Sequence, residues 1–364
     1  MFTALGMILC NPIGMIEEEL RCGETGRRLC ENFSSPHDMK CRMMVMQYAA
    51  LRPWIEPATK CLDPLLAGAD AGLMSVDIDM AVSSNNEYSY VGIICGLPLT
   101  EHCTSIQNFV NRCSTLGFET LMPYLKGCLQ LGLNLHGKAD NVLVLSGQNF
   151  DAEETLWILD EKKNAQGITY IFLLKLFLAV FMNEFELAIA IAQRLTRCNK
   201  ESFGAFLLMY VQVLSSLSEA IVAGETGRRS NVKASLKAFK RLKKFVRKST
   251  NSWEGRFEMI MAEHDARNGM YDSAASKLTF AASYADSYGL IHEKAFSLER
   301  LGRLQINYQG RTDNGIESLH HAQEAYREWG CEPKCEMIES FIAMKEAERN
   351  SVQYRCSHRS ELNF

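Results

Sequence analysis

Eight basic side chains crowd one short segment of the chain and could together bind a negatively charged partner. They are Lys233, Lys237, Lys240, Arg241, Lys243, Lys244, Arg247 and Lys248. Apolar residues alternate with them at helical spacing, which predicts one apolar and one basic face: Leu236, Phe239, Leu242 and Val246. Such a helix can bind an acidic protein partner, calmodulin, anionic lipid or phosphate groups. The alternative, which we favour, is a repeat helix whose apolar face packs inward and whose charges are solvated. On both interpretations the solvent-facing candidates for partner binding are Lys237, Lys240, Lys244 and Lys248.

A second candidate for anion binding is the hexapeptide GETGRR, which occurs twice, at Gly23–Arg28 and Gly224–Arg229. Glycine-rich turns before helices can bind phosphate. A Walker loop, however, has the spacing Gly-x4-Gly-Lys-Ser/Thr, and neither copy has that spacing or the lysine. We therefore expect both copies to form exposed turns between helices.

Cysteine and histidine side chains near the C-terminus could contact a metal ion. Cys331 and Cys335 are four residues apart, and His320 and His321 are close in sequence. Structural zinc sites favour closer cysteine pairs, and the chain has no CxxC motif, so we expect no metal. The total of 13 cysteines is odd and follows no secretory leader, which favours free thiols and a cytoplasmic location.

No set of residues in the sequence has the spacing of a known catalytic motif. GxSxG, HExxH and paired-carboxylate patterns are all missing, and the 8 histidines are scattered. The chain also lacks the glycine-rich loop and the His-Arg-Asp triplet of a kinase. We therefore predict a protein that is not an enzyme and that needs no cofactor.

Composition excludes two further classes. The net charge of −4 argues against a dedicated nucleic-acid binder. Met1–Ile16 is apolar but lacks the basic start of a leader. Ile171–Met182 is apolar but contains Lys175 and is shorter than the roughly 20 residues of a membrane-spanning helix. We expect both segments to be buried helices and expect no transmembrane segment.

The elements that must position any site repeat along the chain. Tyr271–Gly289 and Thr312–Gly330 align with a shift of 41 residues. A fixed period of this size is typical of stacked helical hairpins, which bury their apolar faces only against neighbouring repeats. Asn183 begins a weaker third copy, 86 residues before Gly269. The predicted structural residues of the repeat are Tyr271, Ala274, Leu278, Gly289, Leu319, Ala322, Tyr326, Trp329 and Gly330.

The predicted fold is therefore all-α, a tetratricopeptide-like solenoid of antiparallel helical hairpins. Proline is scarce, at 8 residues, and no linker divides the chain. We predict one continuous array over residues 1–348, weakly divided near 134–151, and a frayed polar tail over 349–364. Ala58–Val82 is expected to form one long helix and Glu332–Glu348 the last one.

The closing repeat resembles a known family. SLHHAQEAYREWGCEPKCEMIE places Ala322, Tyr326, Trp329, Gly330 and Lys334 at the positions of the signature A-x-x-x-Y-x-x-W-G-A-x-x-K. That signature closes the helical-repeat region of the hybrid sensor histidine kinase and serine/threonine kinase–AAA ATPase signalling proteins. Upstream, GLMSVDIDMA is similar to a family stretch with glycine where this chain has Val76, and LSGQNFDAEE resembles a family turn. The resemblance extends roughly from Met1 to Glu348.

The resemblance implies a non-catalytic scaffold and sensing arm that couples an NTPase to output modules. Its concave face would bind a protein partner, a neighbouring signalling domain or another ligand. One alternative is that the chain belongs to a kinase or AAA ATPase enzyme, because full-length relatives carry those domains. A second alternative is a stand-alone adaptor that holds an acidic partner through the basic helix. The sequence predicts no oligomeric state.

Overall fold

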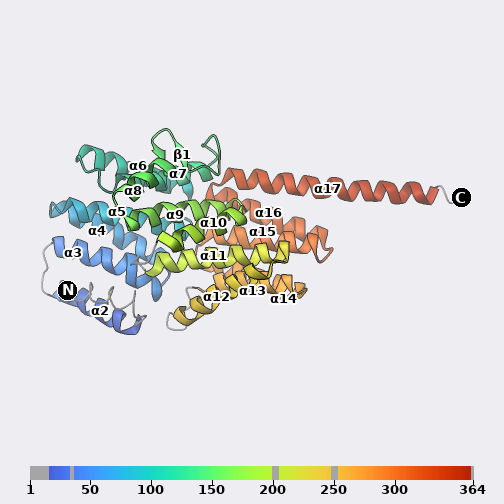
Figure 1. Ribbon diagram of the computed structural model, residues 1–364, viewed down its shortest axis with the longest axis horizontal. Helices are drawn as coiled ribbons and strands as arrows, with labels where there is room; N and C mark the ends of the chain where they lie inside the picture. The colour runs from blue at the N-terminus through green and yellow to red at the C-terminus, as the bar shows by residue number, and fades with distance from the viewer. Residues whose placement is uncertain (1–15, 33–36, 199–204, 247–252, 362–364) are drawn as a thin grey trace.

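In a computed structural model of the chain, the structure describes residues 16–32, 37–198, 205–246 and 253–361, which are almost entirely helical (Figure 1). The first α-helices are α2 (Ile16–Asn32), α3 (His37–Val45), α4 (Leu62–Met74), α5 (Ile78–Cys95), α6 (Leu99–Thr115), α7 (Met122–Leu135), α8 (Ala152–Glu161) and α9 (Ala165–Phe181). The remaining ones are α10 (Phe185–Cys198), α11 (Ala205–Thr226), α12 (Arg229–Val246), α13 (Glu254–Arg267), α14 (Tyr271–Ser287), α15 (Ile291–Asn307), α16 (Thr312–Trp329) and α17 (Glu332–Glu361). Short π- and 3₁₀-helical pieces connect α3 to α4: η1 (Met46–Leu51), η2 (Arg52–Trp54) and η3 (Ala58–Cys61).

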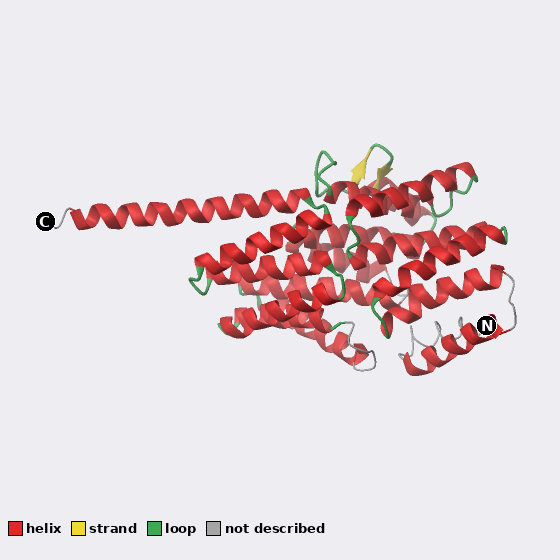
Figure 2. Ribbon diagram, turned by 180° about the vertical axis from the view of Figure 1, so that it is seen from behind, coloured by secondary structure: helices red, strands yellow, loops and turns green. Residues whose placement is uncertain are grey.

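Successive helices pack against each other as adjacent pairs. The pairs are α4 with α5, α6 with α7, α9 with α10, α11 with α12, α13 with α14, and α15 with α16. Short connections between helices impose this hairpin arrangement, and Figure 2 shows the resulting stack of rods. The predicted all-α helical-repeat solenoid is therefore confirmed. Within the described residues, no helix combines the length and the apolar character needed to cross a membrane.

The two aligned repeats occupy equivalent structural positions. Leu278 and Leu319 are both buried. Gly289 and Gly330 both end a helix with positive φ, at 70° and 94°, a conformation that costs glycine nothing. Asn183 has a φ of 64° and ends the α9–α10 turn, as Gly269 does before α14 with a φ of 78°. The structure thus supports Asn183 as the start of a third copy.

One predicted helix is divided in two. We expected Ala58–Val82 to be continuous, but α4 ends at Met74 and α5 begins at Ile78. Val76 adopts a φ of 61° in the turn between them, and the Asp77 carboxylate caps α5 by accepting a hydrogen bond from the Met80 amide at 3.4 Å. Local capping therefore outweighs the helical pattern at this position.

The strained turn leads to a prediction. Val76 stands where the resembling family has glycine, and a β-branched residue at positive φ is disfavoured by about 1–2 kcal/mol. Val76→Gly should therefore raise the urea midpoint of unfolding, although the added flexibility of the unfolded chain removes part of the gain. Val76→Ala keeps a Cβ atom and serves as the control. A glycine variant less stable than the alanine variant would contradict the assignment of strain.

Three other expectations need correction. The first GETGRR copy, Gly23–Arg28, lies inside α2 and is not a turn. The Glu24 carboxylate stabilises the helix here, because it binds Arg27 and Arg28 of α2 and also Arg52 of η2. The second copy does form the α11–α12 turn around Gly227. Leu236 was expected on the apolar face of the basic helix, but its side chain is 37% exposed and Ser235 is buried instead. The last helix continues to Glu361, beyond the predicted end at Glu348.

Two two-residue strands, β1 (Ser146–Gly147) and β2 (Phe150–Asp151), form a small antiparallel hairpin before α8. They lie at the end of the loop-rich interval where the array was expected to be weakly divided. The Asn134 side chain holds this loop by donating to the Val142 and Val144 carbonyl oxygens at 2.9 and 2.7 Å.

The main hydrophobic core joins helices that are distant in sequence. Trp329 of α16 packs against Phe181 of α9, with ring centroids 5.4 Å apart, and against His292 of α15 at 5.4 Å. Phe181 also stacks on His292 at 5.2 Å. Contacts in this array are therefore not restricted to neighbouring repeats, because α9 contributes to the same core as the final hairpin.

Candidate functional site

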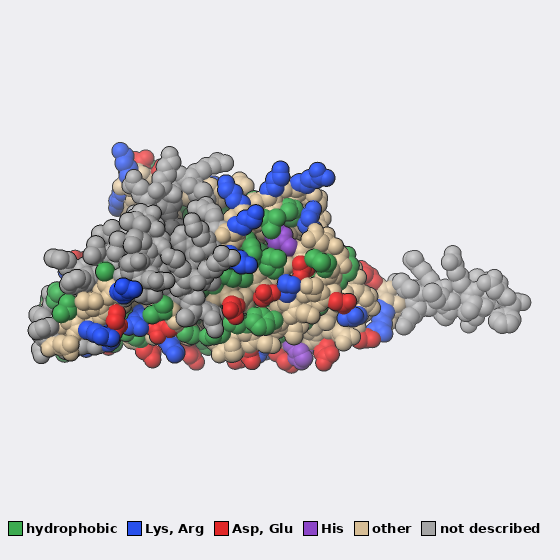
Figure 3. All heavy atoms as spheres, turned by 90° about the horizontal axis from the view of Figure 1, so that it is seen from below, with side chains coloured by type: hydrophobic (Ala, Val, Ile, Leu, Met, Phe, Trp, Pro, Cys, Tyr) green, Lys and Arg blue, Asp and Glu red, His purple; other side chains and the backbone are tan. Residues whose placement is uncertain are grey.

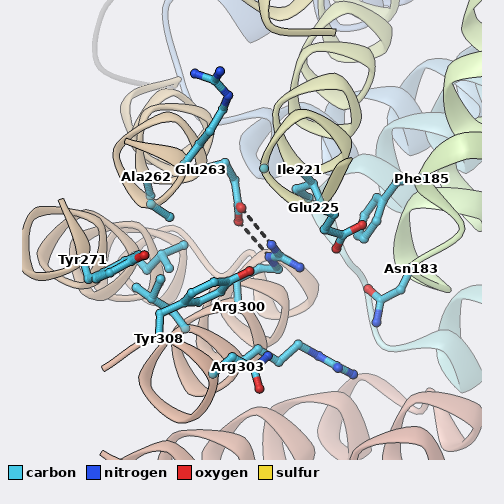
Figure 4. Close-up of a pocket in the computed structure, with 16 residues that line it drawn as sticks. Asn183, Phe185, Ile221, Glu225, Ala262, Glu263, Tyr271, Arg300, Arg303 and Tyr308 are labelled. Carbon is cyan, nitrogen blue, oxygen red and sulfur yellow. Dashed lines mark hydrogen bonds and ion pairs between the residues drawn. The ribbon is translucent and has the colours of Figure 1, made fainter. Parts of the chain in front are cut away.

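A groove of about 340 Å³ lies between α11, α13, α14 and α15 and includes the turn that precedes α10 (Figure 4). Its volume falls in the range of pockets that bind small molecules or side chains. It is one of several hollows in the described part of the chain. We single it out because several ionisable and aromatic side chains from different repeats point into it.

One wall of the groove is fixed by a buried ion pair. Arg300 of α15 donates from Nε and Nη2 to the two carboxylate oxygens of Glu263 of α13, both at 2.7 Å. Burial disfavours the charge on Arg300, but the Glu263 carboxylate outweighs this and raises the pKa of Arg300. The Arg300 guanidinium also lies over the Phe185 ring, 5.8 Å from its centroid. This two-point geometry holds Arg300 in one orientation.

Glu225, near the end of α11, presents a carboxylate to the groove without an ion-pair or hydrogen-bond partner among the described residues. In Figure 4 its carboxylate lies beside the Arg300 guanidinium, close to the Phe185 ring. The residue is accessible to solvent, yet neighbouring protein atoms partly desolvate its carboxyl group and raise its pKa, while the Arg300 charge acts in the opposite direction. Glu225 is thus an ionisable group whose charge is incompletely compensated.

Asn183 lines the same end of the groove from the α9–α10 turn. Its Nδ2 donates to Glu299 Oε1 at 2.8 Å, and its Oδ1 is buried without a hydrogen-bond donor. Because the Glu299 carboxylate can only accept, the amide orientation of Asn183 is determined. The unsatisfied oxygen must therefore face away from Glu299.

Two tyrosines and two leucines form the other end of the groove. The rings of Tyr271 and Tyr308 are stacked, with centroids 5.3 Å apart and an interplanar angle of 20°. Leu278 and Leu304 lie beside them and are buried. This end therefore offers an apolar surface with phenolic hydroxyl groups at its edge.

Behind the groove, a cluster of charges joins four segments around Glu299. Its carboxylate forms an ion pair with Lys334 Nζ at 2.5 Å. It also accepts hydrogen bonds from the Tyr326 hydroxyl at 3.0 Å, from Arg303 Nε at 3.1 Å and from Asn183. Burial alone would raise the pKa of Glu299, but the charges of Lys334 and Arg303 outweigh it and lower that pKa to about 2. The cluster fixes α15, α16, α17 and the α9–α10 turn relative to one another.

The structure divides the sequence-predicted residues among three places. Tyr271 and Leu278 line the groove, and Tyr326 belongs to the Glu299 cluster. The others pack in the interior or end helices: Ala274, Leu319, Ala322 and Trp329 are buried, and Gly289 and Gly330 follow α14 and α16.

The basic helix α12 does not contribute to the groove. Lys237 and Lys240 are exposed, as predicted, whereas the side chain of Lys244 and the whole of Lys248 lie outside the described residues. Figure 3 views the molecule from the side on which α12 lies, and the protruding Lys and Arg side chains on this face gather mostly toward one edge.

The cysteines and histidines considered for metal binding are not brought together. Cys331 and Cys335 are buried, and the Cys335 thiol donates to the Gln323 carbonyl oxygen at 3.5 Å. His320 and His321 are exposed. In the described ranges, no group of three or more His, Cys, Asp or Glu side chains could hold a metal ion.

Sequence reasoning missed the residues that define the groove and its support: Asn183, Glu225, Glu263, Glu299 and Arg300. One signal was present. Glu263 and Arg300 are 37 residues apart, and so are Arg256 and Glu293, which form a second buried ion pair between α13 and α15 at 2.7 Å. Opposite charges recurring at a near-repeat spacing indicate contacts between equivalent helices of successive hairpins.

The arrangement supports non-covalent binding. Arg300 and Arg303 are held by carboxylates, the tyrosine pair offers a flat surface, and Glu225 and Asn183 Oδ1 remain as acceptors.

No family model and no curated protein matches this chain.

Proposed function

We propose that the chain is a non-catalytic helical-repeat scaffold and sensing arm of a signal-transduction protein. It binds a segment of a partner protein or a neighbouring signalling domain in the groove. The observation that carries the proposal is the groove itself, in which helices of successive repeats present fixed charges beside a stacked tyrosine pair. The resemblance of the closing repeat to the kinase–ATPase signalling family supports the signalling context, and the free buried cysteines are consistent with a cytoplasmic location.

The mechanism is mechanical. The groove is lined by α11, α13, α14 and α15, and a ligand that touches all of them favours one relative arrangement of these helices. The Glu299 cluster connects the same helix α15 to α16 and α17. Binding can therefore be transmitted from the groove to the C-terminal helix, and through it to an output module.

A pull-down with matched variants tests the groove. Tyr308 lines the groove and is 53% exposed, whereas Phe280 of α14 lies outside the groove and is 47% exposed. Because both side chains are exposed, alanine at either position should leave the fold intact. We expect partners from native lysate to bind the unmodified chain and Phe280→Ala, and to be lost with Tyr308→Ala. Equal capture by all three proteins would refute the groove as the binding site.

The scaffold interpretation also predicts the absence of turnover. The purified chain should hydrolyse no ATP and transfer no phosphate, because it lacks a Walker loop and the kinase catalytic residues. A phosphate-release assay against a mock-purified control measures this. Turnover above that control would favour the alternative in which the chain is part of a kinase or AAA ATPase.

The second alternative, an adaptor that acts through the basic helix, rests on exposed lysines of α12. Neither Lys237 nor Lys240 forms an ion pair with a described residue. Replacing both with glutamine should leave the melting temperature nearly unchanged. If α12 holds an acidic partner, capture by the glutamine variant should weaken at low salt, where surface charges are least screened. Undiminished capture would leave α12 as a solvated repeat helix.

A further inference from the structure

The acceptor groups at one end of the groove lack donors. The Glu225 carboxylate has no ion-pair or hydrogen-bond partner among the described residues, and Asn183 Oδ1 is buried without a donor. Figure 4 shows both groups at the end of the groove where Phe185 lies. A buried oxygen without a donor destabilises the unliganded protein, so a ligand that donates to it gains more than one that binds at the surface.

The basic groups nearby are already engaged. Arg300 is held by both oxygens of Glu263, and Arg303 donates to Glu299 while lying 4.3 Å from the centre of the Phe341 ring. Arg267, a third arginine that lines the groove, donates to Asn268 Oδ1 at 3.4 Å. The two arginines that act on the Glu225 charge, Arg300 and Arg303, are therefore already bound by other carboxylates, and the acceptors that remain without donors decide which ligand fits.

The Glu225 carboxylate and Asn183 Oδ1 are best satisfied by N–H donors that carry positive charge. A guanidinium group can donate to a carboxylate and to an amide oxygen at once, and its flat face can lie against an aromatic ring. A primary ammonium group can satisfy the same two acceptors. We propose that this end of the groove binds an organic cation, a guanidinium or primary ammonium group, between Glu225 and Asn183. The inference rests on the proposed function and names the chemistry that the groove recognises.

Titration calorimetry with three probes tests the inference. N-acetylarginine amide carries the guanidinium group, and N-acetylcitrulline amide is its neutral counterpart of similar shape. Agmatine is a small diffusible molecule that carries both a guanidinium and a primary ammonium group. We expect the unmodified chain to bind the arginine probe at least about tenfold more tightly than the citrulline probe, because hydrogen bonds to charged groups are the stronger ones. Tighter binding of capped arginine than of agmatine assigns the cation to a protein segment, and the reverse order assigns it to a free amine.

Matched variants locate the effect. Glu225→Gln keeps the size of the side chain and removes its charge, so it should abolish the preference for arginine over citrulline. Glu186→Gln removes a nearby exposed carboxylate that binds Arg228 at 2.8 Å outside the groove, and it should keep the preference. Circular dichroism of both variants verifies the fold.

The inference is overturned if the unmodified chain binds both capped probes equally or neither, or if Glu225→Gln retains the preference. Such a result leaves the proposed function intact when partner capture still depends on Tyr308. If partner capture does not depend on Tyr308 either, both the inference and the proposed function are refuted.

Discussion

Trp329→Ala should destabilise the folded chain by about 3–5 kcal/mol, as expected for truncation of a buried aromatic side chain. Trp329 is 1% exposed. Its ring contacts Phe181, His292 and Tyr326, at centroid distances of 5.4, 5.4 and 6.5 Å. Chemical denaturation measures the loss, and Trp329→Phe, which keeps an aromatic ring, should lose less.

Amide hydrogen exchange locates the helices that Trp329→Ala destabilises. From the repeat pattern alone, exchange should rise from about Ile291 onward while the first hundred residues stay protected, because each repeat contacts only its neighbours. The structure extends this expected region of faster exchange to α9, because Phe181 of α9 packs directly on Trp329. We therefore expect faster exchange in α9 and in α15–α17. Uniform loss of protection, or loss without α9, would contradict this packing.

Lys334→Ala should cost about as much, roughly 3–5 kcal/mol, because it breaks a fully buried ion pair. The side chains of Lys334 and Glu299 are both 0% exposed, and Lys334 Nζ lies 2.5 Å from Glu299 Oε2. Lys345→Ala on the same helix is the matched control. Lys345 pairs with Glu348 at 3.0 Å near the surface, and such pairs contribute at most about 1 kcal/mol. Comparable losses for the two alanine variants would refute the special role of Lys334.

The same cluster determines how stability depends on pH. The pKa of Glu299 is about 2 in the folded chain, against an ordinary value of 4.5. The carboxylate therefore contributes stability that is fully present above about pH 4.5 and is lost as the pH falls toward 2. In Lys334→Ala the pKa of Glu299 should rise, so the acid-induced loss should shrink. Combining Lys334→Met with Glu299→Gln should cost less than the sum of the single changes, and denaturation between pH 2 and 6 measures both effects.

The fold could be predicted because its determinants are local and periodic. The 41-residue repeat, with apolar positions such as Leu278 and Leu319 and glycine after each helix, identified the stacked hairpins without tertiary information. Local patterns failed where a single contact decided the outcome. The first GETGRR copy stays helical because Glu24 binds neighbouring arginines, and α4 ends because Asp77 caps the next helix.

The groove could not be predicted, because its residues come from separate repeats. Asn183 and Glu299 are 116 residues apart, and only the packing of α9 against α15 brings them together. The residue types of the closing repeat are visible in the sequence, but the contacts that they make are not. Tyr326 and Lys334 both bind Glu299, an acidic residue that no motif singled out.

The helix α17 adds a consequence of a different kind. It runs from Glu332 to Glu361 and extends alone beyond the stacked helices (Figure 1). Lys334 fastens its first turn to Glu299, while the opposite end stands free of the body. At 1.5 Å per residue the helix is about 45 Å long, so a tilt of about 5° at its base would move its tip by about 4 Å. A small rotation of α15 would therefore be amplified into a displacement of several ångströms at the far end of α17.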